Sequence, residues 1–335
     1  MKIDIFCHIL PAAYYEKMTS VSTRGAYLQK RIREIPSMVD LDERFRMMDM
    51  FGEYQQIVSL AAPPIEALAG PEGSPALARM ANDGMADLTR KHPDRFPSFV
   101  ASLPLNNVDA SLREIDRALD ELGACGIQLF TNINGKPLDD PEYTPIFERM
   151  AKADLPIWIH PSRTATFADY ATEDHSKYEL WWVFGWPYES SVAMARIAFA
   201  GYFDRWPELK LITHHMGAMI PYFQGRIGPG LDQLGSRTED EDLTLHLKRL
   251  KKRPFDYFKM FYADTALFGA QDAVELGIKF FGVDHVLFSS DMPFDPEKGT
   301  FNIRMTIKDL ENLPLSREDR YKIYEGNARR LLKLQ

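Results

Sequence analysis

Hydrophobic residues follow two alternating patterns along the chain, short apolar runs and longer stretches with helical spacing. The apolar runs are rich in β-branched and aromatic residues and end at polar or turn-forming residues, which is typical of buried strands. In the longer stretches apolar residues recur every three or four positions, which predicts amphipathic helices. Strands are predicted at residues 3–8, 57–60, 96–103, 126–130, 155–160, 209–214, 259–265 and 284–290. Helices are predicted at residues 75–91, 107–122, 141–153, 188–209, 270–277, 300–313 and 316–332.

This alternation fits two α/β architectures, a closed (β/α)8 barrel and an open doubly wound sheet. An open sheet usually binds its ligand at a switch point served by a glycine-rich turn after the first strand. Here the first predicted strand runs into Cys7-His8-Ile9-Leu10-Pro11, and the sequence contains no dinucleotide-binding fingerprint. We therefore expect an α/β fold of the (β/α)8 TIM-barrel type.

Residues 12–50 form a long insertion of mixed character after the first predicted strand. Its last part, Asp40 to Met50, has a helical pattern with Asp40 as the N-cap. No internal repeat, low-complexity tract or linker divides the sequence. Residues 1–335 are therefore expected to form a single barrel domain that ends in two C-terminal helices.

Four of the predicted strands end at a histidine or an aspartate. The first ends at His8, the fifth at His160, the sixth at the pair His214-His215, and the last at Asp291. In a closed parallel barrel the carboxyl ends of all strands meet at one mouth, so these side chains are expected to converge. Imidazole and carboxylate are the ligands of a divalent metal site.

Charge and composition exclude several classes of partner. The formal net charge of −8, without an extended basic run, argues against a nucleic-acid or anionic-membrane surface. No stretch approaches ~20 uninterrupted apolar residues, so no membrane span is expected. Met1-Lys2 leads directly into a predicted strand, without the pattern of a signal peptide. Two cysteines, Cys7 and Cys125, cannot form a disulfide framework, which favours a reducing, cytoplasmic setting.

Several short motifs occur in a recognisable order. They are Asp-Ile-x-x-His at the N-terminus, Ile-His-Pro, His-x-Gly followed by three residues and Pro, and Ser-Asp-x-Pro-Phe near the end, together with Gly185-Trp186-Pro187, Phe261-Tyr262-Ala263-Asp264 and Gly326-Asn327-Ala328. In their order and spacing they resemble the aminocarboxymuconate-semialdehyde decarboxylase branch of the amidohydrolase superfamily, which includes γ-resorcylate and 5-carboxyvanillate decarboxylases. The resemblance runs over most of the chain and implies a metal-dependent (β/α)8 barrel.

The resemblance also implies roles for particular residues. His8, His160 and Asp291 match metal ligands, and His215, counted back from Pro221, matches the histidine that acts beside the metal. Arg226 matches an arginine that grips the substrate carboxylate, reaching the site of a neighbouring subunit in relatives. A second carboxylate-binding arginine matches Arg31 or Arg33, with Arg33 as our choice. A homodimer or higher homo-oligomer is therefore expected.

Position 6 departs from the family pattern. Where the resemblance implies a histidine or glutamate as first ligand, this chain has Phe6, which cannot bind a metal. Three protein ligands and a water can hold a catalytic zinc. The alternatives are that His214 or His215 completes the ligand set, or that the metal is weak or absent. Strand alternation places Asp4, Phe6 and His8 on one face and turns Cys7 away, so Cys7 is not expected to replace the ligand.

Two further features allow a structural and a functional interpretation. Trp181, Trp182, Phe184, Trp186 and Tyr188 could line a pocket for a flat aromatic acid, with Trp186 against the substrate, or could pack a loop onto the barrel. Asp264, also at a strand end, could hold a loop by hydrogen bonds.

The sequence thus predicts a metal-dependent non-oxidative decarboxylase of a hydroxylated aromatic or muconate-like carboxylic acid. His215 and Asp291 are the candidate acid and base, the metal is zinc or alternatively manganese, and no organic cofactor is expected. One alternative is a hydrolase or hydratase that uses a metal-bound water at the same site. Another is a non-catalytic barrel that binds an acidic ligand, which is suggested by Phe6.

Overall fold

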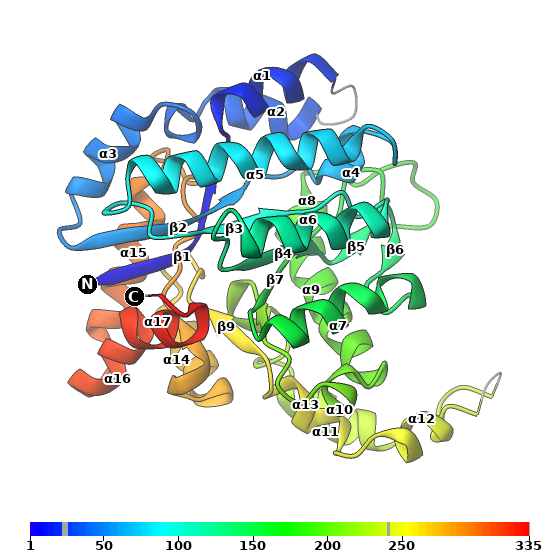
Figure 1. Cartoon of the computed structure of the whole chain (residues 1–335). Helices are drawn as coiled ribbons and strands as arrows, with labels where there is room; N and C mark the ends of the chain where they lie inside the picture. The colour runs from blue at the N-terminus through cyan, green and yellow to red at the C-terminus, as the bar shows by residue number, and fades with distance from the viewer. Residues whose placement is uncertain (22–25, 240–241, 335) are drawn as a thin grey trace.

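Eight parallel strands form one sheet in the computed structural model, which describes residues 1–21, 26–239 and 242–334 (Figure 1). Each strand pairs with the one before it, in the order β1-β2-β3-β4-β7-β8-β9-β10. These strands are β1 (Lys2–Ile9), β2 (Tyr54–Leu60), β3 (Phe99–Ser102), β4 (Gly126–Phe130), β7 (Ile157–His160), β8 (Leu211–Thr213), β9 (Tyr262–Asp264) and β10 (Val286–Leu287). The predicted (β/α)8 barrel is confirmed.

Helices surround the barrel on its outer side (Figure 1). Those before β7 are α1 (Ala12–Val21), α2 (Ala26–Arg33), η1 (Pro36–Met38), α3 (Leu41–Asp49), α4 (Ile65–Leu68), α5 (Ser74–Lys91), α6 (Val108–Asp120), η2 (Pro141–Tyr143) and α7 (Thr144–Ala153). Those from β7 to β10 are α8 (Leu180–Val183), α9 (Gly185–Phe199), α10 (Tyr202–Arg205), η3 (His215–Gly217), α11 (Gln224–Asp232), α12 (Thr244–Arg249), α13 (Pro254–Phe258), α14 (Gln271–Phe281) and η4 (Val283–His285). The last are α15 (Thr300–Asn312), α16 (Arg317–Tyr321), η5 (Lys322–Gly326) and α17 (Asn327–Leu332).

Two apolar clusters form the core. The larger lies between the strands and the surrounding helices, and the smaller fills the barrel, where Phe6, Trp158 and Ile212 are fully buried. Inside the barrel the Trp158 indole Nε1 donates to the carbonyl of Ile5 at 3.0 Å. This packed interior leaves no room for a ligand inside the barrel, so polar side chains at the carboxyl ends of the strands are the ones that can form its site.

The first strand contains an irregularity that overturns one predicted orientation. Its pairing with β2 shifts register between Asp4 and Cys7. Ile5 and Phe6 both join the cluster inside the barrel, whereas Asp4 accepts a hydrogen bond from Tyr54, which belongs to the outer cluster. The prediction that Asp4 shares a face with Phe6 and His8 is therefore wrong, because a bulge interrupts the alternation of side chains.

The barrel closes between its first and last strands. Ile5 N donates to Phe288 O at 3.1 Å, and His8 N donates to Met292 O at 2.9 Å. Ser290 adds a side-chain bond, since its hydroxyl donates to Asp4 Oδ2 at 2.5 Å. The segment that follows β10 thus completes the barrel, although the strand itself is shorter than the predicted range 284–290.

The insertion between β1 and β2 consists of α1, α2, η1 and α3, of which the structure describes all but residues 22–25. Asp40 caps α3, as predicted, by accepting a hydrogen bond from Glu43 N at 3.1 Å. The short hairpin β5 (Asn132–Ile133) and β6 (Lys136–Pro137) was not predicted. Among the described residues, no helix has the length and apolar character needed to cross a membrane.

Candidate metal centre

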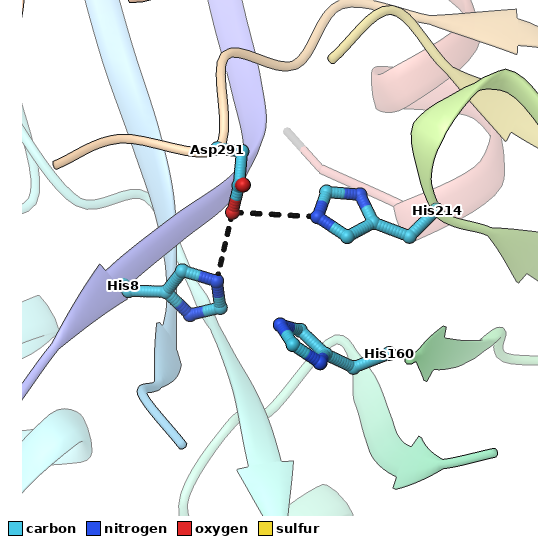
Figure 2. A group of neighbouring side chains, drawn as sticks. All are labelled: His8, His160, His214 and Asp291. Carbon is cyan, nitrogen blue, oxygen red and sulfur yellow. Dashed lines mark ion pairs between the residues drawn. The ribbon is translucent and has the colours of Figure 1, made fainter. Parts of the chain in front are cut away.

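Four side chains converge at the mouth of the barrel. His8, His160, His214 and Asp291 each direct one nitrogen or oxygen to a common point, and these atoms lie within 4.8 Å of one another (Figure 2). Atoms bound at about 2.1 Å to one tetrahedral ion lie about 3.4 Å apart. The four side chains can therefore share a metal ion if each moves by less than about an ångström.

The four residues come from distant parts of the chain. His8 and His160 lie at the ends of β1 and β7, His214 directly follows β8, and Asp291 lies in the segment after β10. Asp291 Oδ1 lies 3.0 Å from His8 Nε2 and 3.3 Å from His214 Nε2 (Figure 2). The expected convergence of His8, His160 and Asp291 is present.

Both histidines of the pair after β8 face Asp291. His215 has φ of +53°, so the chain turns sharply at the strand end instead of continuing the alternation of an extended strand. The two imidazole rings consequently stack, with centroids 3.7 Å apart. His215 Nε2 lies 3.6 Å from Asp291 Oδ2, on the opposite carboxylate oxygen from His214. Neither histidine is a remote structural group.

Asp264 positions this histidine pair from the end of β9. Its Oδ2 is hydrogen bonded to His214 Nδ1, and its Oδ1 accepts hydrogen bonds from His215 N at 3.1 Å and Ala266 N at 3.0 Å. With Nδ1 held by the carboxylate, the remaining nitrogen Nε2 of His214 is directed to the centre. The loop-holding role considered for Asp264 is thus present, together with a direct effect on His214.

The other two imidazoles are oriented in the same way. His160 Nδ1 lies 2.7 Å from the carbonyl oxygen of Pro161, which accepts its proton and leaves Nε2 as a lone-pair donor. His8 Nδ1 lies 3.4 Å from Ser59 Oγ, and its Nε2 faces Asp291. A second partner on each ring fixes the orientation that a metal ligand requires.

The charges at the centre are those of a metal site. Burial, together with His8 and His214, lowers the pKa of His160 well below its usual range, so this ring is neutral and can coordinate a cation. Burial opposes ionisation of Asp291, but His214, His215 and His8 lower the pKa of this carboxyl well below its usual range. Burial also opposes charge on His214, while Asp264 and Asp291 raise its pKa to about 10. Without a bound cation, a proton on His214 therefore offsets the negative charge of Asp264 and Asp291. A bound metal ion would supply positive charge at the same place.

The residues present fit a divalent ion. Within the described part of the chain, His214 Nε2 and Asp291 Oδ1 are buried, and their polar neighbours are the other members of the cluster. Buried polar atoms need partners, and these atoms point to the same place. Three imidazoles and one carboxylate match the donor set of zinc or manganese sites.

Phe6 forms the floor of this centre. Its ring lies 5.7 Å from the His8 ring, 5.8 Å from the His160 ring and 4.0 Å from the His214 ring, between centroids. His214 occupies the fourth corner of the cluster, which is the role that the sequence left open between His214 and His215.

The residues predicted to bind substrate lie in different places. The Trp186 ring, on α9, stands edge-on to the His160 ring with centroids 5.5 Å apart, so Trp186 lines the mouth. Arg31 reaches the loop after Asp291 and donates to the carbonyl of Asp295 at 2.5 Å, whereas Arg33 is exposed. Arg226, on α11, is exposed and lines a separate hollow of about 790 Å³. None of the described residues around that hollow belongs to the metal cluster.

A buried arginine supports the cluster from below and was not identified from the sequence. Arg44, on α3, is fully buried and donates to the carbonyl of His8 at 2.9 Å and to Gln56 Oε1 at 2.7 Å. The sequence carried a signal, because Arg44 shares one helical face with the buried residues Met47 and Met48.

A histidine and carboxylate cluster at the carboxyl ends of barrel strands is characteristic of metal-dependent enzymes with a (β/α)8 fold. The chain belongs to the amidohydrolase family, whose profile matches residues 3–334. It is 35% identical over 303 residues to γ-resorcylate decarboxylase from Polaromonas sp. strain JS666, covering 88% of this chain and 87% of that protein. The family resemblance predicted from the sequence is confirmed.

Solved structures agree with this assignment. The crystal structure of 2,6-dihydroxybenzoate decarboxylase from Rhizobium matches with a TM-score of 0.79 and 27% identity, over 99% of this chain and 98% of that one. A dihydroxybenzoic acid decarboxylase from Polaromonas sp. JS666, solved with bound manganese and the inhibitor 2-nitroresorcinol, matches with a TM-score of 0.75 and 28% identity, over 99% and 96% of the two chains.

Proposed function

We propose that this protein is a metal-dependent non-oxidative decarboxylase of a hydroxylated aromatic or muconate-like carboxylic acid. The observation that carries the proposal is the convergence of three imidazoles and one carboxylate at the barrel mouth. The decarboxylase relatives support the reaction class. The reaction exchanges the carboxylate for a proton at one carbon, and it needs no oxidant and no organic cofactor.

His8, His160 and Asp291 hold the divalent ion in this proposal, and His214 supplies the fourth ligand in place of residue 6. When bound, the ion acts as a Lewis acid and as a template that orients the substrate carboxylate and a neighbouring hydroxyl. The presence of manganese in a similar structure supports manganese, and the imidazole-rich donor set also suits zinc.

Asp291 and His215 handle the proton. Loss of CO2 leaves an electron pair on the substrate carbon, and that pair takes up one proton. Asp291 is ionised at rest, so the proton comes from solvent through His215, of whose side chain 12% is exposed. His215 passes the proton to Asp291 Oδ2, which it faces, and Asp291 relays it to the substrate carbon, because Oδ1 is directed to the metal point. Burial, together with His214, lowers the pKa of His215, which makes the protonated ring a ready donor.

The substrate ring lies against Trp186, which forms a wall beside His160. Arg33 was our choice for the second carboxylate-binding arginine, but Arg31 extends toward the loop after Asp291 and is the better placed of the two. We assign to Arg31 the role of holding this loop, with its guanidinium as a fork for an anionic substrate.

Arg226 acts across a subunit interface in this proposal, so the active protein is a homodimer or higher oligomer. Its exposure, and its place beside a hollow that no residue of the described metal cluster lines, support a role outside its own subunit. Mixing inactive Arg226→Ala with inactive Asp291→Asn subunits tests this role, because a mixed dimer contains one site with both residues intact. Recovery of up to about a quarter of the activity is expected from random pairing. No recovery under conditions of subunit exchange contradicts the cross-subunit role.

The decisive experiment measures CO2 release from the manganese-loaded protein with a panel of hydroxybenzoates, beside ester and lactone hydrolysis. Release of CO2 from at least one acid, lost in Asp291→Asn, is the expected result. Hydrolysis without CO2 release indicates a hydrolase, and neither activity with less than about half an equivalent of bound metal indicates a non-catalytic barrel. We further propose a cytoplasmic setting, which the two free, buried cysteines Cys7 and Cys125 support.

A further inference from the structure

A small hollow of about 10 Å³ lies beside the metal centre, at the carboxyl ends of β2, β3 and β4. Phe130 forms one wall, and its ring lies 5.0 Å from the His160 ring between centroids. Leu60 forms another wall and directly follows Ser59, whose hydroxyl faces His8. The hollow therefore shares the Phe130 ring with the surroundings of His160 and lies one residue along β2 from the contact of Ser59 with His8.

Three polar atoms from different elements surround this hollow without a partner. Glu66 Oε1, Ser102 Oγ and Gln128 Oε1 are buried, and within the described residues they have no hydrogen-bond partner. The three side chains are 5%, 6% and 3% exposed, respectively. Isolated unpaired atoms of this kind are unusual in folded proteins, and three around one hollow indicate a ligand that pairs with them.

The chemistry of the three groups selects that ligand. The Gln128 amide nitrogen donates to Leu60 O at 3.3 Å, which leaves the amide oxygen as an acceptor. Burial raises the pKa of Glu66 to about 8, so its carboxyl is protonated at neutral pH and can donate. The Ser102 hydroxyl can do either. A neutral group that both donates and accepts, namely a hydroxyl, satisfies all three.

Size and charge exclude larger or anionic ligands. A hollow of about 10 Å³ has room for about one water-sized group. The described residues that line it include no lysine or arginine, so a carboxylate would meet no counter-charge there.

We propose that this hollow, the Glu66 subsite, binds one hydroxyl group through Glu66, Ser102 and Gln128. In the free enzyme the hydroxyl belongs to a water molecule, and in the complex it belongs to a ring hydroxyl of the substrate that is remote from the departing carboxylate. The substrate half of this inference rests on the proposed function, whereas the water half does not.

Binding experiments test the substrate half. The manganese-loaded protein is titrated calorimetrically with 2-hydroxybenzoate and with its 2,3-, 2,4- and 2,5-dihydroxy counterparts, whose second hydroxyl does not flank the carboxylate, so that turnover is not needed for a signal. At least one dihydroxybenzoate binds about tenfold more tightly than 2-hydroxybenzoate, as expected for one added hydrogen-bonded hydroxyl. In Ser102→Ala and Gln128→Leu this preference disappears, and affinity for 2-hydroxybenzoate is retained.

Thr306→Val is the matched control, because Thr306 also carries a buried hydroxyl without a described partner but lies on α15, outside the subsite. This variant keeps the preference. The inference is overturned if wild-type protein binds 2-hydroxybenzoate without preferring any dihydroxybenzoate, or if the preference survives in both subsite variants.

Crystal structures of wild type and of Gln128→Leu, both without a bound acid, test the water half. They also distinguish a failure of the Glu66 subsite from a failure of the proposed function. An oxygen within hydrogen-bond distance of Glu66, Ser102 and Gln128 is expected in the wild type and absent from the variant. A dry hollow in the wild type overturns the subsite, whether or not the protein releases CO2. If the oxygen is present and no benzoate binds, the proposed substrate class has failed and the substrate half of the inference fails with it.

Discussion

The ring of Phe6 stacks on the ring of His214, with centroids 4.0 Å apart and planes 15° from parallel. Phe6 occupies the strand position at which the family resemblance implies a first metal ligand. The apolar ring cannot bind an ion, but it supports the imidazole that completes the cluster from another strand. The contact between Phe6 and His214 therefore links the position that lacks a ligand to the imidazole that completes the cluster.

Phe6→His is expected to strengthen metal binding, because it adds a fourth imidazole beside the three that converge. We expect the affinity for Mn²⁺ or Zn²⁺, measured by competition with a chelator, to rise about tenfold or more. Phe6→Leu is the control, since it replaces the aromatic ring by another apolar side chain and adds no ligand. An affinity for Phe6→His no higher than that of Phe6→Leu contradicts the assigned position of the ion.

His214→Gln is expected to lose metal affinity, whereas His215→Gln is expected to lose catalytic rate. His214 lies in the cluster, so its loss lowers metal affinity at least about tenfold. His215 lies outside the cluster and its Nε2 faces Asp291 Oδ2, the oxygen turned away from the metal point, so its variant retains metal but loses about 10²–10⁴-fold in kcat. Metal content by elemental analysis and kcat at saturating metal separate the two roles, and the opposite pattern would exchange them.

Arg44→Met is expected to destabilise the protein by about 3 kcal/mol or more, because it leaves buried acceptors on His8 and Gln56 without their donor. Urea unfolding of the metal-free protein measures the change. Arg46→Met, on the same helix, is the control, since Arg46 is exposed and forms a surface ion pair with Glu43. If both variants lose a similar amount of unfolding free energy, the cause is a weakened α3 helix, and the bonds of Arg44 to His8 and Gln56 do not explain the loss.

Glu66 is expected to make the unfolding free energy depend on pH. Burial raises the pKa of Glu66 from 4.5 to about 8 in the folded protein. Below pH 4.5 the carboxyl is protonated in both states, and its contribution to stability is fully present. As the pH rises toward 8, the unfolded chain releases this proton and the folded chain does not, so stability falls by up to about 1.4 kcal/mol per pH unit.

Glu66→Gln therefore flattens the decline in stability across this pH range. Denaturant unfolding of the metal-free protein at several pH values measures the slope, and the exposed Glu121→Gln, on the surface after α6, retains the wild-type slope. An unchanged slope in Glu66→Gln would show that the carboxyl already ionises in the folded state.

The barrel and the meeting of His8, His160 and Asp291 could be predicted because they depend on local patterns. Strand and helix periodicities differ, and a parallel barrel brings all strand ends to one mouth. Irregular backbone could not be predicted in the same way. Alternation along β1 assigned Asp4 to the wrong face, since a bulge leaves no signature in the side-chain pattern.

The exact set of converging residues also depends on local backbone dihedral angles, which cannot be read from the sequence. The positive φ of His215 turns both histidines of the pair toward Asp291, where an extended strand would have separated them. Arg44 and Glu66 were missed for a different reason. Each is a charged residue type in a buried position, and only the surrounding tertiary contacts show how it is accommodated.

The hydrogen bond between Asp4 and Ser290 joins residues 286 positions apart. Synthesis runs from the amino terminus, so Asp4 is made well before Ser290. A nascent polypeptide therefore cannot form this bond or assemble the complete ligand set until residue 291 has been added. Products that terminate before residue 291 lack one member of the cluster, so weaker metal uptake is expected to distinguish them from longer products.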